Sequence, residues 1–137
     1  MNSFLRGRFP RYFVGIVLIG TGLGKALDMP GFVAVIESYR LAPHAVNVAL
    51  AYTLPFLELG TGILLTTGRF VLSAAGIAVA LHVLMIIVVL TTLGRGIRVE
   101  NCGCFGVFLA RPLSYTTLIE DAVMLAVSVW AWINARN

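Results

Sequence analysis

Charged residues are scarce in this chain of 137 residues, and their scarcity excludes an ordinary soluble domain. Only 12% of the residues are charged and 59% are hydrophobic, with a mean hydropathy of +0.95. Soluble domains are about 25% charged and about 45–50% apolar. A fold of this size buries too small a share of its surface to hide so much apolar side chain from water. The composition therefore predicts one domain, residues 1–137, that is integral to a membrane.

The chain also lacks basic runs, interleaved aromatic platforms, low-complexity tracts and long linkers. Its net charge of +4 comes from scattered arginines. Nucleic-acid binding needs clustered positive charge, so we expect the lipid bilayer and no nucleic acid as a partner. Only two histidines, His44 and His82, are present. A structural zinc ion needs four ligands, so no zinc site is expected.

Four long apolar stretches predict four membrane-spanning helices, because a span needs about 20 apolar residues. The third stretch is the cleanest, and the fourth begins at Pro112, a residue that suits the first turn of a helix. The predicted fold is an all-α four-helix membrane bundle. Its spans run over residues 12–27, 44–65, 70–93 and 112–133.

Two smaller features predict how the spans are arranged. A short helix after Pro30 is expected to lie on the membrane surface on its apolar face, which carries Phe32, Val35, Ile36 and Tyr39. Small residues let membrane helices approach closely, so the GxxxG pair in the first span is expected to pack against another helix. The same role is expected of the small residues Gly15, Gly20, Gly24, Gly60, Gly62, Ala74, Ala75 and Ala78.

An even number of spans places both chain ends on one side of the membrane. Positive charges are balanced between the two sides, so the orientation depends on the first helix. Three arginines precede that helix, namely Arg6, Arg8 and Arg11. They predict cytoplasmic termini in a bacterial inner membrane. The cysteine loop, residues 94–111 between the third and fourth spans, then faces the periplasm, where disulfides persist.

The cysteine loop holds both cysteines of the chain in the motif ENCGCFG, residues 100–106. A disulfide needs Cα atoms about 4.4–6.8 Å apart, which Cys102 and Cys104 reach only in a tight turn. Gly103 permits the backbone angles of such a turn. The ring would be small and strained, and therefore suited to exchange more than to stabilisation.

Other interpretations of the pair stay open. Cysteines in membrane proteins are often small apolar fillers, although a polar, glycine-rich loop is an unusual place for them. Two thiolates also suit Cu(I) or Hg(II), so a soft-metal transporter or chaperone that uses Cys102 and Cys104 is the alternative function. Arg95 and Arg98 lie close in sequence and are expected to favour the thiolate form.

Five ionisable residues fall inside the predicted spans, where charge is costly and usually faces the bundle interior or a pathway. Lys25, Glu120 and Asp121 are near the membrane side that carries the cysteine loop, whereas Glu58 and His82 are near the membrane centre. A functional network would protonate leaving thiolates or line a quinone pocket. A structural network would pair Lys25 with a carboxylate and hydrogen-bond His82 to Glu58, which satisfies buried charge.

Three segments, GTGLGKALD in the first span, LPFLELGTG in the second and NCGCFG after the third, resemble the MauE family of DoxX-like membrane proteins. The resemblance covers about residues 10–135. It implies a four-helix membrane bundle. It also implies a role beside a thioredoxin-like protein in maturing a disulfide-rich periplasmic dehydrogenase subunit.

The same resemblance assigns roles to individual residues. It makes Cys102 and Cys104 the redox pair, and it matches Lys25 and Glu58 to recurrent polar positions of the family. Many members carry a basic residue early in the fourth span, where this chain has two acidic residues.

Together these features predict a membrane thiol–disulfide oxidoreductase or electron-transfer protein. A thiolate of a thioredoxin-like extracytoplasmic partner attacks the Cys102–Cys104 disulfide, and exchange through a mixed disulfide serves disulfide formation or maturation of exported proteins. One cysteine pair cannot relay electrons across the membrane alone. Re-oxidation therefore needs a second protein or a quinone held among the spans. A structural subunit with incidental cysteines is the remaining interpretation.

Overall fold

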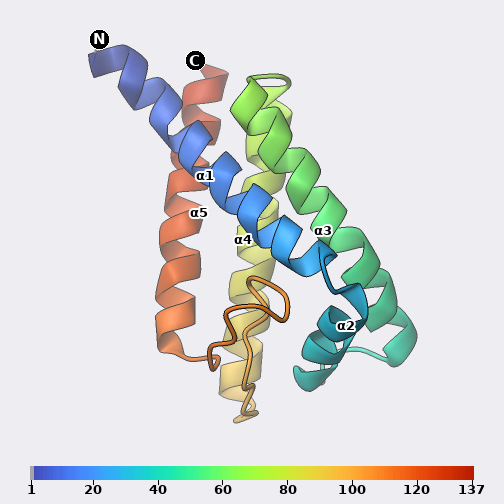
Figure 1. Ribbon diagram of the computed structural model, residues 1–137. Coiled ribbons are helices and arrows are strands. Elements are labelled where there is room, and N and C mark those ends of the chain that lie inside the picture. The colour runs from blue at the N-terminus through green and yellow to red at the C-terminus, as the bar shows by residue number, and fades with distance from the viewer. Residues whose placement is uncertain (1) are drawn as a thin grey trace.

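The chain folds as five α-helices with one long irregular segment between the last two (Figure 1). The computed structural model describes residues 2–137, with side chains from Arg6 onward. The all-α prediction is confirmed. The helices are α1 (Asn2–Ala26), α2 (Met29–Ser38), α3 (His44–Thr67), α4 (Val71–Gly94) and α5 (Tyr115–Arg136).

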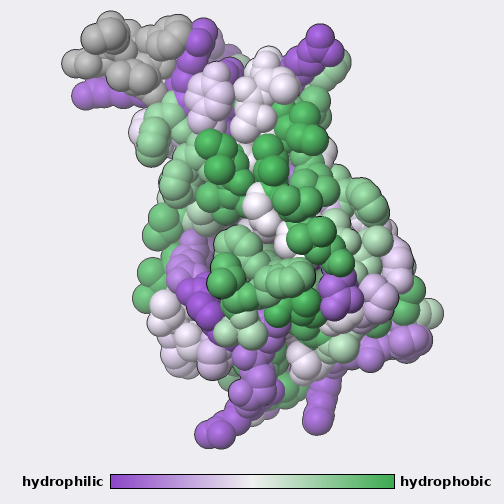
Figure 2. All heavy atoms as spheres, viewed as in Figure 1, coloured by the Kyte–Doolittle hydropathy of each residue, from purple (hydrophilic) through white to green (hydrophobic). Residues whose placement is uncertain are grey.

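Three helices, α3, α4 and α5, are long and apolar enough to cross a membrane. Helices α1 and α2 meet the same criterion only as a pair, which is bent by 99°. By length and composition, the described chain therefore has three candidate spans, or four if the bent pair is one span. Figure 2 shows apolar side chains across the middle of the visible face and hydrophilic ones toward its two ends, as in a bilayer protein. Both termini lie at one end of the bundle in Figure 1, and the cysteine loop lies toward the other.

Two helix boundaries differ from the prediction. Helix α1 begins near the chain start rather than at residue 12, because the helix continues through Pro10 beyond its apolar part. Helix α5 begins at Tyr115 rather than at Pro112. Ser114 is its N-cap, and the N–H of Ser114 donates to Oγ1 of Thr117 at 3.4 Å. This hydrogen bond fixes the first turn, so Pro112 lies outside the helix.

Small residues allow α1 and α3 to cross closely, as predicted. A Cβ on Gly62 would lie 2.6 Å from the carbonyl oxygen of Gly15, and a Cβ on Gly15 would lie 3.0 Å from the carbonyl oxygen of Gly62. The small residues of α4 pack fully buried in the same core, namely Ala74, Ala75 and Ala78. Gly60 is the exception, because a Cβ there would meet no described atom within 4 Å.

The predicted apolar face of helix α2 is not free to contact lipid, because two of its members, Phe32 and Tyr39, pack inside the protein. Phe32 and Tyr39 are 4% and 5% exposed, because the cysteine loop folds back against this helix. Tyr39 packs in one apolar cluster with Val89, Val99 and Cys102. Asp28 caps the helix, and its Oδ1 accepts a hydrogen bond from the N–H of Gly31 at 3.0 Å.

We expect Gly62→Ala to destabilise the protein by about 1–3 kcal/mol, because the added methyl group meets backbone that cannot move without separating α1 from α3. The matched control is Gly60→Ala on the same helix, where space is open and alanine has the higher helix propensity. Thermal unfolding in detergent measures both variants. Equal melting temperatures for the two variants would contradict this account of the crossing.

Candidate functional site

The two cysteines stand side by side in a turn built by glycine. Their sulfur atoms lie 3.1 Å apart, and both residues are free thiols. Gly103 between them has a φ of +79°, a left-handed conformation that favours glycine. The side chain of Asn101 holds the turn, since its Oδ1 accepts from the N–H of Gly103 at 2.9 Å and its Nδ2 donates to the carbonyl of Gly106 at 3.0 Å. The predicted tight turn is therefore present.

The two halves of the irregular segment are tied together around Cys102. The N–H of Cys102 donates to the carbonyl of Arg111 at 2.8 Å, and the N–H of Leu113 donates to the carbonyl of Val99 at 2.9 Å. The hydroxyl of Tyr39, at the end of α2, donates to the carbonyl of Cys102. These bonds bring Arg111 back beside the cysteines, which its distance along the chain did not suggest.

The cysteine loop rests directly on the backbone of α1. A Cβ on Gly24 would lie 2.7 Å from the carbonyl oxygen of Phe105, and a Cβ on Gly106 would lie 2.6 Å from the carbonyl oxygen of Gly24. A Cβ on Gly20 would meet Phe105 at 4.0 Å. The GxxxG pair was expected to pack against another helix, and it instead receives the loop.

The two thiols face different surroundings. Cys102 is buried, with 4% of its surface exposed, whereas Cys104 is half-buried. Cys104 borders a cavity of about 240 Å³, which we call the polar cavity. Cys102 borders a second cavity of about 180 Å³, which we call the apolar cavity. The polar cavity is lined by the ionisable residues Lys25, Glu58, His82, Arg111, Glu120 and Asp121.

The pair is electrostatically asymmetric. A hydrogen bond from the Cys104 thiol, a second from its backbone N–H, and the nearby charge of Arg111 lower the pKa of Cys102 to about 6, although burial opposes them. The hydrogen bond with Cys102, burial and the negative charges of Cys102 and Asp121 raise the pKa of Cys104 well above its ordinary value. The reduced pair therefore holds one thiolate, on Cys102, and one neutral thiol.

Arg111 stands where the polar cavity meets the surface. Its guanidinium binds both carboxylate oxygens of Glu120, at 2.8 and 2.6 Å, and both side chains are close to half exposed. Arg95 was predicted from the sequence to favour the thiolate. Its guanidinium instead donates to the carbonyls of Tyr39 and Arg40, at 3.2 and 2.9 Å. Arg98 lines a separate surface hollow beside Arg40. Arg111 is thus the arginine whose charge acts on Cys102.

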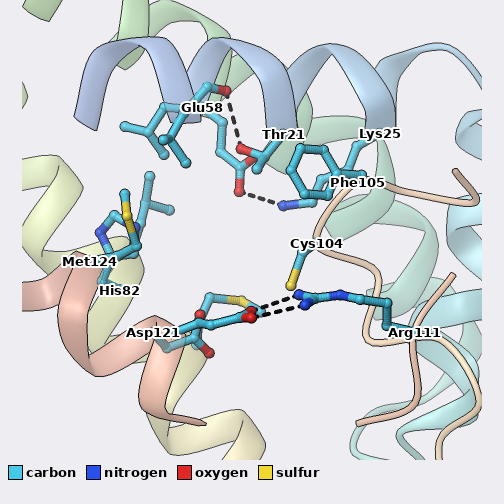
Figure 3. Close-up of a pocket in the computed structure, with 14 residues that line it drawn as sticks. Thr21, Lys25, Glu58, His82, Cys104, Phe105, Arg111, Asp121 and Met124 are labelled. Atoms are coloured by element: carbon cyan, nitrogen blue, oxygen red, sulfur yellow. Dashed lines mark hydrogen bonds and ion pairs between the residues drawn. The ribbon is translucent and has the colours of Figure 1, made fainter. Parts of the chain in front are cut away.

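Lys25 and Glu58 form a buried ion pair at 2.6 Å (Figure 3). The hydroxyl of Thr21 donates to the second oxygen of Glu58 at 3.2 Å. The expectation that Lys25 pairs with a carboxylate is confirmed. The pair links α1 to α3 directly beneath the cysteine loop.

His82 makes a different contact from the one expected. Its Nδ1 lies 2.7 Å from the carbonyl oxygen of Ala78 and 3.1 Å from the hydroxyl of Ser128. Because a carbonyl can only accept, Nδ1 carries the proton and Nε2 is left as an acceptor. Within the described residues these contacts replace the expected bond to Glu58. His82 lines the polar cavity with Glu58 without bonding to it.

Asp121 is a carboxylate of the polar cavity, and one of its oxygens makes no hydrogen bond to the described residues. Its Oδ2 is buried and has no hydrogen-bond partner in the described part of the chain. Glu120 is bound to Arg111 and Glu58 to Lys25, whereas Asp121 faces the same space as Cys104 (Figure 3). A buried unpaired oxygen in a native fold needs an explanation, and a functional role is one.

Within the described residues, no group of three or more His, Cys, Asp and Glu side chains is arranged to hold a metal ion. In the described part of the chain, the cysteine pair offers two sulfur ligands that no third ligand of these types joins. The soft-metal alternative stays a prediction, and it rests on the two thiolates alone.

A family model described as methylamine utilisation protein MauE matches residues 5–134. Among curated relatives, methylamine utilization protein MauE of Methylophilus methylotrophus is 32% identical over 88% of this chain and 62% of its own length. The protein of the same name from Paracoccus denitrificans is 24% identical, over 87% and 64%. That from Methylorubrum extorquens is 31% identical, over 91% and 68%. The chain thus spans under two thirds of the first two relatives. No solved structure matches.

We expect the reduced protein to form one thiolate with a midpoint near pH 6, seen as an increase in thiolate ultraviolet absorbance, while the second thiol stays protonated. Cys102→Ser removes this step. Arg111→Gln raises the midpoint, because a positive charge favours the thiolate. The rise stays below about one unit, since the arginine is close to half exposed.

Arg98→Gln is the matched control, because it removes a positive charge from the same loop at a place away from the sulfurs. It should leave the midpoint unchanged. A first midpoint in the ordinary thiol range of about 8.5 would contradict the asymmetry, and so would equal shifts in the two arginine variants.

Proposed function

The chain belongs to the MauE family, and from this premise we propose that it is a membrane thiol–disulfide exchange protein whose Cys102–Cys104 pair takes electrons from a thioredoxin-like extracytoplasmic partner. The observation that carries the proposal is the asymmetric pair. The two sulfurs lie 3.1 Å apart. Cys102 is a buried residue and its pKa is lowered, whereas Cys104 is half-buried and borders the polar cavity. The names of the relatives concern methylamine utilisation, and we extend that role to this chain as maturation of exported proteins of such a system.

The different burial of the two cysteine residues supports an order for the exchange. In the oxidised state a thiolate of the partner attacks Sγ of Cys104, because Cys102 is buried. The Cys102–Cys104 bond breaks, a disulfide forms between the partner and Cys104, and Cys102 leaves as a thiolate. A thiol of low pKa is the better leaving group, so the lowered pKa of Cys102 speeds this step.

A second exchange completes the transfer. The partner's other thiolate attacks the partner sulfur of the mixed disulfide, and Cys104 is released as a thiolate. The partner leaves as a disulfide, and two electrons have passed to the cysteine pair. Because the pKa of Cys104 is raised, the released thiolate takes up a proton at once.

Asp121 is the residue placed to deliver that proton. It lines the polar cavity with Cys104, its Oδ2 has no partner in the described chain, and its charge is one cause of the raised pKa of Cys104. Glu58 and Glu120 are held in ion pairs. A positioned carboxyl group with a free oxygen is suited to proton transfer.

We infer the direction of electron flow from the same asymmetry. Stabilising the Cys102 thiolate stabilises the reduced pair, and a pair with a stabilised reduced form is a stronger oxidant. The pair therefore accepts electrons and leaves its partner oxidised, as disulfide formation requires.

The proposed role also sets the arrangement in the membrane. We take α1 and α2 as one bent span, which gives four spans with α3, α4 and α5. The termini then lie in the cytoplasm of a bacterial cell, and the cysteine loop lies on the extracytoplasmic side of the inner membrane, where an exported partner reaches it. The three arginines near the chain start support this orientation.

The attacked sulfur is tested with two single-cysteine variants, Cys102→Ser and Cys104→Ser, each loaded with the chromogenic thiol thionitrobenzoate. A reduced thioredoxin-like protein that retains only its attacking cysteine is then added. The dye should leave Cys104, in the Cys102→Ser variant, at least roughly tenfold faster than it leaves Cys102, in the Cys104→Ser variant, because Cys102 is buried. Release from Cys104 should leave a protein–protein disulfide that is visible on a non-reducing gel.

Loading in denaturant is the control, and both variants should take up dye equally there. Faster release from Cys102, or release without a protein–protein disulfide in either variant, would overturn the assignment.

A further inference from the structure

The apolar cavity is not used by the exchange with a protein partner. It lies between α2, α3 and α4 beneath the cysteine loop, and its volume is about 180 Å³. Cys102 and Gly103 form its wall on the loop side. Most of the other lining residues are aliphatic, including Val35, Leu50, Leu54, Leu84 and Val88.

We propose that this cavity binds a quinone, which re-oxidises the cysteine pair through Cys102. This inference rests on the proposed function, because a pair that accepts two electrons from a partner must pass them on. The chain has no other cysteines to receive them. An acceptor that reaches Cys102 from within the bundle must be apolar, and quinones are the membrane-soluble electron acceptors of that kind.

The position of the cavity gives it access to lipid. Leu84 on α4 and Leu41 before α3 line it and are 44% and 45% exposed, so the cavity has an opening at the surface of the protein. A lipid-soluble molecule therefore reaches the cavity from the membrane side. A protein partner reaches the pair through Cys104 and the polar cavity instead.

The polar atoms of the apolar cavity suit a carbonyl-bearing ring. Lys25 and Asn47 line it and are 4% and 3% exposed. Each retains N–H groups that can still donate. Nζ of Lys25 carries three N–H groups and donates one of them to Glu58. Nδ2 of Asn47 carries two N–H groups and donates one of them to the carbonyl of Ala42. Quinone oxygens are acceptors, and buried donors need acceptors.

Cys102 in the wall of the apolar cavity can react with a quinone, whereas it cannot react with an ordinary lipid tail. Cys102 presents a buried thiolate, and a quinone ring is an apolar electrophile. The Cys102 thiolate adds to a ring carbon, and the quinone oxygen takes a proton from the ammonium group of Lys25, which lines this cavity and is reprotonated from water. Cys104 then loses its proton to Asp121, which keeps it for the next exchange, and attacks Sγ of Cys102. The S–C bond breaks, its electron pair stays with the ring, and the ring takes its second proton from water and leaves as hydroquinone. One thiolate and one thiol become one disulfide, and one quinone takes two electrons and two protons.

The test uses the full-length protein, purified in detergent without quinone and with its pair reduced. The probe is a ubiquinone analogue with a decyl tail. Its reduction is followed by absorbance and the loss of thiols by a thiol reagent. We expect one quinone reduced for every two thiols lost. Absence of reduction in the wild type would overturn the proposal.

Variants then locate the site. Val88→Trp fills the cavity and should slow quinone reduction at least roughly tenfold, whereas Leu90→Trp on the same helix, 50% exposed and outside the cavity, should not. Leu54→Trp on the facing helix is a second filling variant if Val88→Trp unfolds. Unchanged rates in a folded filling variant would overturn the location.

The same variants separate this inference from the proposed function. In a Cys102→Ser background, Val88→Trp should still form the mixed disulfide through Cys104, because that sulfur is reached from the other cavity. Mixed disulfide without quinone reduction in the wild type would overturn the quinone site and leave the exchange function standing. Quinone reduction without a mixed disulfide would overturn the exchange function and leave the quinone site standing.

Discussion

The arrangement of the two cysteines depends on one close backbone contact, where the cysteine loop rests on α1 at Gly24. The carbonyl of Phe105 occupies the space in which a side chain at Gly24 would project, and Gly106 meets the same stretch of α1. Because neither glycine carries a side chain, the loop lies across the bundle rather than extending from it (Figure 1). The two cysteines consequently border two different cavities. The folded loop also brings Arg111 to Cys102 and places Cys104 near Asp121, and these charges contribute to the asymmetry of the pair.

The fold tolerates ionisable side chains beneath the cysteine loop because nearly all of them have an ion-pair or hydrogen-bond partner. The Lys25–Glu58 ion pair joins α1 to α3, and removing one member of such a buried pair typically costs about 3–5 kcal/mol. The ion pair also holds together α1 and α3, which lie beneath the cysteine loop. Asp121 differs from its neighbours because one oxygen is buried without a partner in the described chain, and it lines the same cavity as Cys104, the less buried cysteine.

The sequence allowed the helical class, the approximate helix positions, the tight turn at Gly103 and the pairing of Lys25 to be predicted, because each follows from local composition or from the cost of an unpaired buried charge. Contacts between distant segments were not predictable in this way. Arg95 and Arg98 were chosen for their closeness along the chain, whereas Arg111 reaches Cys102 through a backbone hydrogen bond within the folded loop. The burial of α2 and the asymmetry of the two thiols likewise appear only once the loop folds back.

The most direct test of a working redox pair is its oxidation state in living cells. Thiols are trapped with a maleimide large enough to shift the mobility of the protein, with and without prior reduction. The account predicts that untreated protein contains a substantial fraction without tags on Cys102 and Cys104, and that reduction makes both available. Thiols that stay fully reduced in the cell and hold copper or mercury would contradict it.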